Sequence, residues 1–187
     1  NTICITLQAR DIAVLEFIKK ELEFSGEIKR HFNKQFQKEY VCLKINSKRC
    51  VDKLETLGII QCKSGKEKFP DIPKEFISSY ILGFFDGDGC IHFNQEKDNY
   101  SFGVVCLNKE FLQKFVEITN LGYIGKVSPS KLTKQQLYNW IVSKHEHLKQ
   151  LYYYLYSNSS FKLNRKYEKF RNLIQYLNTK IDKRLKI

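Results

Sequence analysis

The sequence predicts an α+β protein made of two pseudo-symmetric units of the order αββαββα, the first of them incomplete. Three observations support this prediction. Short segments alternate apolar and polar residues, as antiparallel strands with one buried face do. Longer segments repeat apolar residues at spacings of three and four, as amphipathic helices do. The order of these segments then recurs along the chain of 187 residues, which indicates an internal duplication.

The first half is predicted to open with a strand and to end with a helix. In order, it contains a strand over residues 2–8, a helix over 10–22, strands over 27–32 and 39–46, and a helix from Ser47 to Gly58. Ser47 is a suitable N-cap, and Gly58 is a suitable helix end. A lysine-rich stretch with two prolines follows over 62–73 and is predicted to be a linker. We therefore divide the chain into domains 1–73 and 74–187.

The second half repeats this order with one more helix and one more strand in front. In order, it contains a helix over residues 76–88, strands over 90–94 and 101–107, a helix over 108–121, strands over 123–128 and 136–143, a helix over 144–156 and a last helical stretch over 161–177. Residues 25–29 correspond to 121–126 at an offset of roughly one hundred residues. The first half thus lacks counterparts of the helix 76–88 and the strand after it, which we expect to precede Asn1 in a longer chain.

The predicted helix over 76–88 combines small and acidic residues. Ser79, Gly83 and Gly87 recur at intervals of four, a spacing that lets a second helix approach closely. Asp86 and Asp88 stand at the helix C-terminus, where the helix dipole disfavours negative charge. A bound cation would offset that charge. The alternative is that both aspartates are turn residues supported by the neighbouring glycines.

The composition favours a polyanionic partner and argues against a membrane protein. The formal net charge is +12, although a protein from an AT-rich genome would also be rich in lysine. No apolar run approaches the ~20 residues of a membrane span, and no secretory signal is visible. The six cysteines form no C-x-x-C pair, and we interpret them as reduced core residues rather than zinc ligands or disulfides. We therefore expect an intracellular protein, in a bacterial or phage cytoplasm or in an organelle such as a mitochondrion or chloroplast.

Residues 81–89, Ile-Leu-Gly-Phe-Phe-Asp-Gly-Asp-Gly, resemble the signature helix of the LAGLIDADG homing endonucleases. The repeated order of elements extends this resemblance over nearly the whole chain. The resemblance implies two signature helices that pack side by side, two sheets that form a saddle over the DNA major groove, and a monomer as the complete chain. It also implies a site-specific double-stranded DNA endonuclease that hydrolyses phosphodiester bonds with Mg²⁺ or Mn²⁺.

The resemblance assigns roles to particular residues of this sequence. Asp88 would bind the metal with help from the carbonyl of Gly87, and Asp86 would be the inner, more structural acid. The second metal-binding acid would lie on a helix outside these 187 residues. The basic residues near the scissile phosphates would be Lys63 and Lys166. Two neighbours of Lys166 are also candidates, with Lys162 competing for its role and Arg165 contacting DNA. Ser79, Gly83 and Gly87 would form the helix interface.

The polar sides of the predicted strands are the candidates for reading DNA, because the major groove distinguishes all four base pairs. These residues are Lys29, His31, Lys44 and Asn46 in the first half, and His92, Asn94, Ser101, Lys126, Ser128 and Asn139 in the second. For each of them the alternative is an ordinary solvated sheet face.

Two other functions are compatible with the sequence. Relatives of the LAGLIDADG enzymes include proteins that bind nucleic acid without cutting it, as intron RNA maturases or as DNA-binding regulators. Homodimerisation through the small-residue face of the helix 76–88 is a third, weaker possibility. The acid at position 88 favours a cutting enzyme, although a chain without its first signature helix would be inactive alone.

Overall fold

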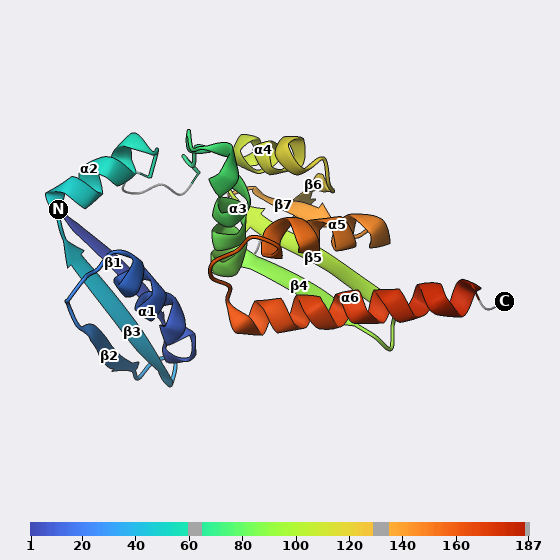
Figure 1. Cartoon of the computed structure of the whole chain (residues 1–187), viewed down its shortest axis with the longest axis horizontal. Coiled ribbons are helices and arrows are strands. Elements are labelled where there is room, and N and C mark those ends of the chain that lie inside the picture. The colour runs from blue at the N-terminus through green and yellow to red at the C-terminus, as the bar shows by residue number, and fades with distance from the viewer. Residues whose placement is uncertain (60–64, 129–134, 186–187) are drawn as a thin grey trace. The chain divides into compact units, whose positions relative to one another are not determined.

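The computed structural model of the chain describes residues 1–59, 65–128 and 135–185, with side chains described as far as residue 180 (Figure 1). It confirms the α+β fold, with one antiparallel sheet in each of two compact units, Asn1–Ile60 and Gln61–Ile187. The described residues 65–73 of the predicted linker lie in the second unit.

The first unit is a three-stranded sheet with helices on one face. It comprises β1 (Thr2–Gln8), the 3₁₀ helix η1 (Ala9–Asp11), α1 (Ile12–Glu21), β2 (Ile28–Asn33), β3 (Lys38–Asn46) and α2 (Lys48–Thr56). The strand order is β1-β3-β2. Leu15 of α1 packs on Val41, Leu43 and Ile45 of the central strand. Ser47 caps α2, as predicted, because its side chain accepts a hydrogen bond of 3.2 Å from the Cys50 N–H.

The second unit is a four-stranded sheet that four helices cover on one face. It comprises α3 (Lys74–Asp88), β4 (Gly89–Asn94), β5 (Asn99–Cys106), α4 (Lys109–Thr119), β6 (Tyr123–Val127), β7 (Leu137–Val142), α5 (His145–Tyr156) and α6 (Asn164–Leu185). The strand order is β4-β5-β7-β6. Side chains of all four helices join those of the sheet in one apolar core. At its centre, the Trp140 indole Nε1 donates a hydrogen bond of 2.9 Å to the Leu121 carbonyl.

The two topologies confirm the internal duplication. The order β1-β3-β2 of the first sheet matches β5-β7-β6 of the second, and α1 and α2 match α4 and α5. Among the described residues, the first unit has no counterpart of α3 or β4. An apolar groove instead lies beside α1, α2 and β1, lined among others by Ile3, Ile5, Ile18 and Ile45. In the second unit α3 fills the equivalent place, packed against α5 and the sheet.

The predicted elements are all present, and their ends differ by a few residues. The last helix begins at Asn164 rather than at residue 161, because the Lys166 and Tyr167 N–H groups are the first to donate to the Leu163 carbonyl. It also continues to Leu185, beyond the predicted end at residue 177. Gly122 lies in the turn between α4 and β6 and has φ +76°. A Cβ at this position would lie 2.2 Å from the Ile141 carbonyl oxygen. Only glycine fits this turn.

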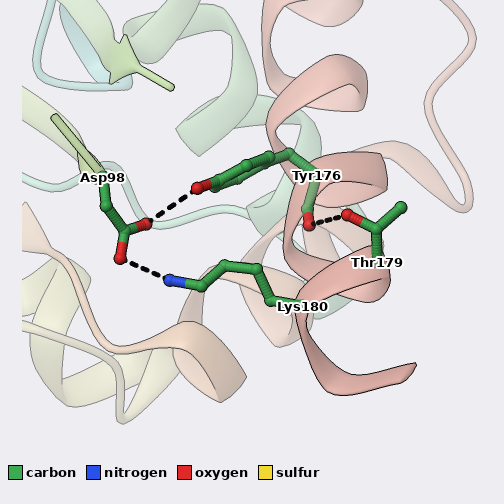
Figure 2. A network of polar contacts seen from close by, with 4 residues as sticks. All are labelled: Asp98, Tyr176, Thr179 and Lys180. Carbon is green, nitrogen blue, oxygen red and sulfur yellow. Dashed lines mark hydrogen bonds and ion pairs between the residues drawn. The ribbon is translucent and has the colours of Figure 1, made fainter. Parts of the chain in front are cut away.

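A polar cluster attaches the C-terminal part of α6 to the turn between β4 and β5 (Figure 2). Asp98 accepts hydrogen bonds from the Tyr176 hydroxyl at 3.1 Å and from the Lys180 ammonium at 2.5 Å. The Asp98 carboxylate raises the pKa of Lys180. Asp98 itself has φ +46°, a left-handed conformation that Asp and Asn adopt more readily than most residues. The cluster therefore fixes one end of α6 to the β4–β5 hairpin.

Tyr80 provides a test of the packing around α3. Its ring lies edge-on to Phe69 at 5.2 Å, and burial, with the nearby Cys106 and Glu67, raises its pKa to about 12. The unfolded phenol ionises near pH 10, so the unfolded chain releases this proton first and stability falls as the pH rises above 10. We expect Tyr80→Phe to lose about 1 kcal/mol less stability than the wild type between pH 9 and pH 11. Urea unfolding at both pH values measures this.

Tyr123→Phe is the matched control, because Tyr123 is 55% exposed on the edge strand β6. It should lose as much stability as the wild type over the same pH range. If Tyr80→Phe and Tyr123→Phe lost the same amount of stability between pH 9 and pH 11, Tyr80 would ionise as readily in the folded protein as in the unfolded one.

Candidate active site and nucleic-acid surface

The helix α3 buries one side and exposes the side that carries its small residues. Ile81, Leu82 and Phe85 are buried, and the Phe85 ring stacks on Phe102 with the ring centroids 4.6 Å apart. On the other side Ser79, Gly83 and Gly87 are exposed. A Cβ added at Gly83 or Gly87 would have no described atom within 4 Å outside its own helical turn. The role of this side as a helix interface stays a prediction.

A buried lysine stabilises the C-terminal end of α3. The Lys166 ammonium donates a hydrogen bond of 2.6 Å to the Phe85 carbonyl, which also accepts from the Gly89 N–H. The ammonium also lies 4.9 Å from the centre of the Phe85 ring, and Lys166 is only 8% exposed. A cation on the last carbonyls of a helix interacts favourably with the helix dipole. Lys166 thus supplies the positive charge that two aspartates at this helix end require.

Asp86 connects the same helix end to the start of α6. One carboxylate oxygen accepts a hydrogen bond of 3.0 Å from the Leu163 N–H, immediately before the helix that carries Lys166. Tyr156 lies close enough that burial and the Asp86 charge together raise the pKa of its hydroxyl. These contacts agree with the expectation that Asp86 is the inner, structural acid.

Asp88, by contrast, is exposed at the last position of α3. Its charge still acts on Lys166. Burial lowers the pKa of Lys166, the charge of Arg165 lowers it further, and the carboxylates of Asp86 and Asp88 oppose this shift. The helix end therefore combines a solvent-accessible carboxylate with a buried amine that loses its proton more readily than an ordinary lysine.

The residues at this helix end fit a hard divalent cation. Mg²⁺ prefers oxygen ligands and commonly takes only one or two protein carboxylates, with water and substrate phosphate completing its shell. Asp88 offers a carboxylate, and Gly87 lies in the last turn, where helix carbonyls lack an intrahelical partner. Among the side chains that the structure describes, no group of three or more His, Cys, Asp and Glu residues could enclose a metal. Asp88 and the Gly87 carbonyl would thus supply only part of the shell of such a cation.

The first sheet gathers its four predicted DNA contacts on the face opposite the helices. By register, Lys44 lies opposite Cys4 and Asn46 opposite Thr2, while Lys29 and His31 lie opposite Cys42 and Tyr40 of β3. All four predicted residues are exposed. Contacts with neighbouring residues hold two of these side chains in place. Thr2 donates a hydrogen bond of 2.8 Å to Asn46, and His31 stacks on Tyr40.

The second sheet gathers four of its six candidates on its open face. His92 pairs with Ser101, Asn94 lies two residues further along the same strand, and Asn139 lies opposite Val105. Asn94 is partly engaged, because its side chain accepts a hydrogen bond of 3.0 Å from the Lys97 N–H in the turn.

Two candidates of the second sheet are placed differently from the prediction. Lys126 lies opposite Tyr138, which in turn lies opposite the buried Cys106, so Lys126 is on the helix-covered face. The reason is that Ile124 packs against the core, and the two-residue period of a strand takes Lys126 to the same side. Ser128 lies beyond the last residue of β6 and is exposed.

The structure describes three of the four other basic candidates. Lys63 lies outside the described residues. The Lys162 ammonium lies 3.7 Å from the centre of the Tyr167 ring, whereas the Lys166 ammonium contacts the end of α3. The assignment of either lysine to the scissile phosphates stays a prediction. Arg165 is exposed in the first turn of α6. The sequence did not indicate the backbone groups of Phe85 and Leu163 that organise the helix end, because contacts between distant segments leave no local pattern.

The cysteines also differ from the prediction. Cys42 and Cys106 are buried, but Cys4 and Cys90 are exposed on the open faces of the two sheets. Cys62 lies outside the described residues. Among the described residues, no helix is both long enough and apolar enough to span a bilayer.

Comparison with known proteins identifies the class of this fold and site. The family model described as LAGLIDADG endonuclease matches residues 81–177, more than half of the chain. The chain therefore belongs to the LAGLIDADG endonuclease family. No curated protein matches the sequence.

Solved structures of this family share the fold. I-LtrWI, a LAGLIDADG homing endonuclease bound to target DNA, is 13% identical, with a TM-score of 0.63 over 96% of this chain and 80% of that one. I-SmaMI, bound to uncleaved DNA in the presence of calcium ions, is 13% identical, with a TM-score of 0.65 over 96% and 81%. I-GzeII in complex with its DNA target is 17% identical, with a TM-score of 0.63 over 97% and 81%.

The two aspartates of α3 are expected to contribute differently to stability. Asp86→Ala removes the acceptor of the Leu163 N–H in a partly buried place and should cost about 1–3 kcal/mol of unfolding free energy. Asp88→Ala removes an exposed charge from the unfavourable end of a helix and should change stability by less than about 0.5 kcal/mol. Chemical denaturation of both variants measures the difference. Equal losses would contradict the division into a structural and an exposed acid.

Proposed function

We propose that this protein is a site-specific double-stranded DNA endonuclease, a homing endonuclease that hydrolyses phosphodiester bonds with a divalent metal ion. The observation that carries the proposal is the exposed carboxylate of Asp88 at the negative end of a helix. Lys166 and Asp86 hold the same helix end through hydrogen bonds to the Phe85 carbonyl and from the Leu163 N–H. An isolated charge there does not favour folding. Membership of the family and the DNA-bound structures that share the fold support the same function.

The open faces of the two sheets are the proposed DNA-binding surface. Antiparallel strands suit this role, because one face packs on helices while the other presents side chains to the major groove. We assign base and phosphate contacts to the candidates on these faces, which are Lys29, His31, Lys44, Asn46, His92, Asn94, Ser101 and Asn139. Arg165 is assigned to the DNA backbone, next to the helix end. The net charge of +12 supports a polyanionic partner. The complete chain is proposed to act as a monomer.

In the proposed reaction the residues at the end of α3 act together. Asp88 and the Gly87 carbonyl would hold Mg²⁺ or Mn²⁺, which when bound offsets the charge of the phosphate and lowers the pKa of a water ligand. Lys166 would hold its ammonium on the Phe85 carbonyl and so place positive charge beside the metal-binding end of α3. Asp86 holds the start of α6 and thereby positions Lys166.

Cleavage by Asp88→Asn tests the metal assignment. The full-length protein is incubated with Mg²⁺ and a library of duplex sites, and the cut ends are identified by sequencing. Asp88→Asn should cut at least about 100-fold more slowly than the wild type while still binding DNA, and EDTA should abolish cutting by the wild type. Asp52→Asn is the control, because Asp52 is an exposed carboxylate paired with Lys48 on α2. Equal cutting by Asp88→Asn and the wild type would refute the assignment.

Alkylation of the reduced protein tests the binding surface. Cys4 and Cys90 are exposed on the open faces, whereas Cys50 lies on α2, beside the groove on the helix-covered face of the first sheet. Duplex DNA at low salt should slow the reaction of Cys4 and Cys90 with N-ethylmaleimide several-fold and leave Cys50 unaffected. Peptide mass spectrometry reads all three sites. Protection by RNA but not by duplex DNA would instead favour the intron maturase function, and protection of Cys50 alone would refute the proposed surface.

A further inference from the structure

Two cysteine thiols meet on the open face of the first sheet. Cys4 of the edge strand β1 lies opposite Lys44, and Cys42 of the central strand β3 lies opposite Thr6. The two cysteines are therefore diagonal neighbours with side chains on the same face. Their Sγ atoms are 3.3 Å apart and share one hydrogen bond, in which either thiol can be the donor.

The surroundings of this pair favour a thiolate. The Thr6 hydroxyl lies 3.8 Å from the Cys4 Sγ, and together the Thr6 hydroxyl, the Cys4 thiol and the charges of Lys44 and Lys29 lower the pKa of Cys42. Thiolates, and not thiols, react with oxidants and with oxidised sulfur. The two positions differ in access, because Cys4 is exposed and Cys42 is only 9% exposed. A small oxidant thus meets Cys4 first, with the Cys42 sulfur directly beside it.

We propose that Cys4 and Cys42 form a peroxide-sensitive dithiol that closes reversibly to a disulfide between β1 and β3. The Cys4 thiol gives its proton to Cys42 through the hydrogen bond that the two sulfurs share. The Cys4 thiolate then attacks one oxygen of hydrogen peroxide, the O–O bond breaks, and Cys4 becomes a sulfenic acid, while the hydroxide that leaves takes the proton from Cys42. The Cys42 thiolate then attacks the Cys4 sulfur, the S–O bond breaks, and water leaves after protonation. In sum, two thiols and one peroxide give one disulfide and two waters, with the peroxide reduced and the sulfurs oxidised.

The position of the pair makes this bridge accessible and reversible. Diagonal neighbours are farther apart than directly opposed residues, so the bridge requires a small shift of one strand. An exposed disulfide in such a place is readily reduced by thiols. The inference is independent of DNA cleavage, because it concerns the free protein.

The test uses the reduced full-length protein, treated with a small excess of hydrogen peroxide and then with N-ethylmaleimide. Mass spectrometry should show loss of two hydrogen atoms and a peptide that joins Cys4 to Cys42, and dithiothreitol should reverse both. Cys4 should oxidise at least about 10-fold faster than Cys90, which is also exposed, since the Cys42 sulfur 3.3 Å away can accept the Cys4 proton.

Variants separate the two roles. With Cys42→Ala, or with Cys42→Val if the alanine variant fails to fold, Cys4 should accumulate as a sulfenic acid that dimedone traps. Cys90→Ser is the matched control and should form the disulfide as the wild type does. Two results would overturn the proposal: peroxide that leaves the wild type without a Cys4–Cys42 peptide, or oxidation of Cys4 at the rate of Cys90.

Discussion

The hydrogen bond from the Lys166 ammonium to the Phe85 carbonyl is the contact on which the candidate site depends. Two aspartates end α3, and the helix dipole makes that end unfavourable for negative charge. A buried cation placed on the last carbonyls compensates them. The cation in turn loses hydration, which lowers its pKa, and the nearby carboxylates partly restore its charged form. The acids and the lysine therefore interact favourably at this helix end.

This contact depends on the docking of α6, which two separate interactions provide. Near its start, the Leu163 N–H is held by Asp86 of α3. Further along, Tyr176 and Lys180 are held by Asp98 in the β4–β5 turn. Between them, Phe170, Leu173 and Leu177 are buried in the core. A straight helix fixed at two points and along one face has little freedom to move Lys166 away from α3. The precision of the site thus comes from the packing of the whole second unit.

The sequence was sufficient for the fold because the fold is local and repeated. The alternation in β3 and the spacing of Ile81 and Phe85 in α3 each reflect one buried face, and the duplication supplies a second instance of the elements from β5 to α5. Lys126 shows where this reasoning fails. On an edge strand a lysine side chain can lie on the helix-covered face of the sheet and still reach solvent. A polar residue there does not indicate which face of the sheet it lies on. Burial of Lys166 and contact of Cys4 with Cys42 are tertiary and leave no periodic signal.

The comparison of the two units shows what the end of α3 requires from its surroundings. The second unit fills the space beside its sheet with α3, and the groove at the equivalent place of the first unit is lined by apolar residues of α1, α2, β1 and β3. Apolar surface of this kind is buried when a partner covers it. One carboxylate and one carbonyl hold a divalent ion weakly without further oxygens. In the proposed function the phosphate of bound DNA would supply further oxygens, and metal binding would then be coupled to recognition of the substrate.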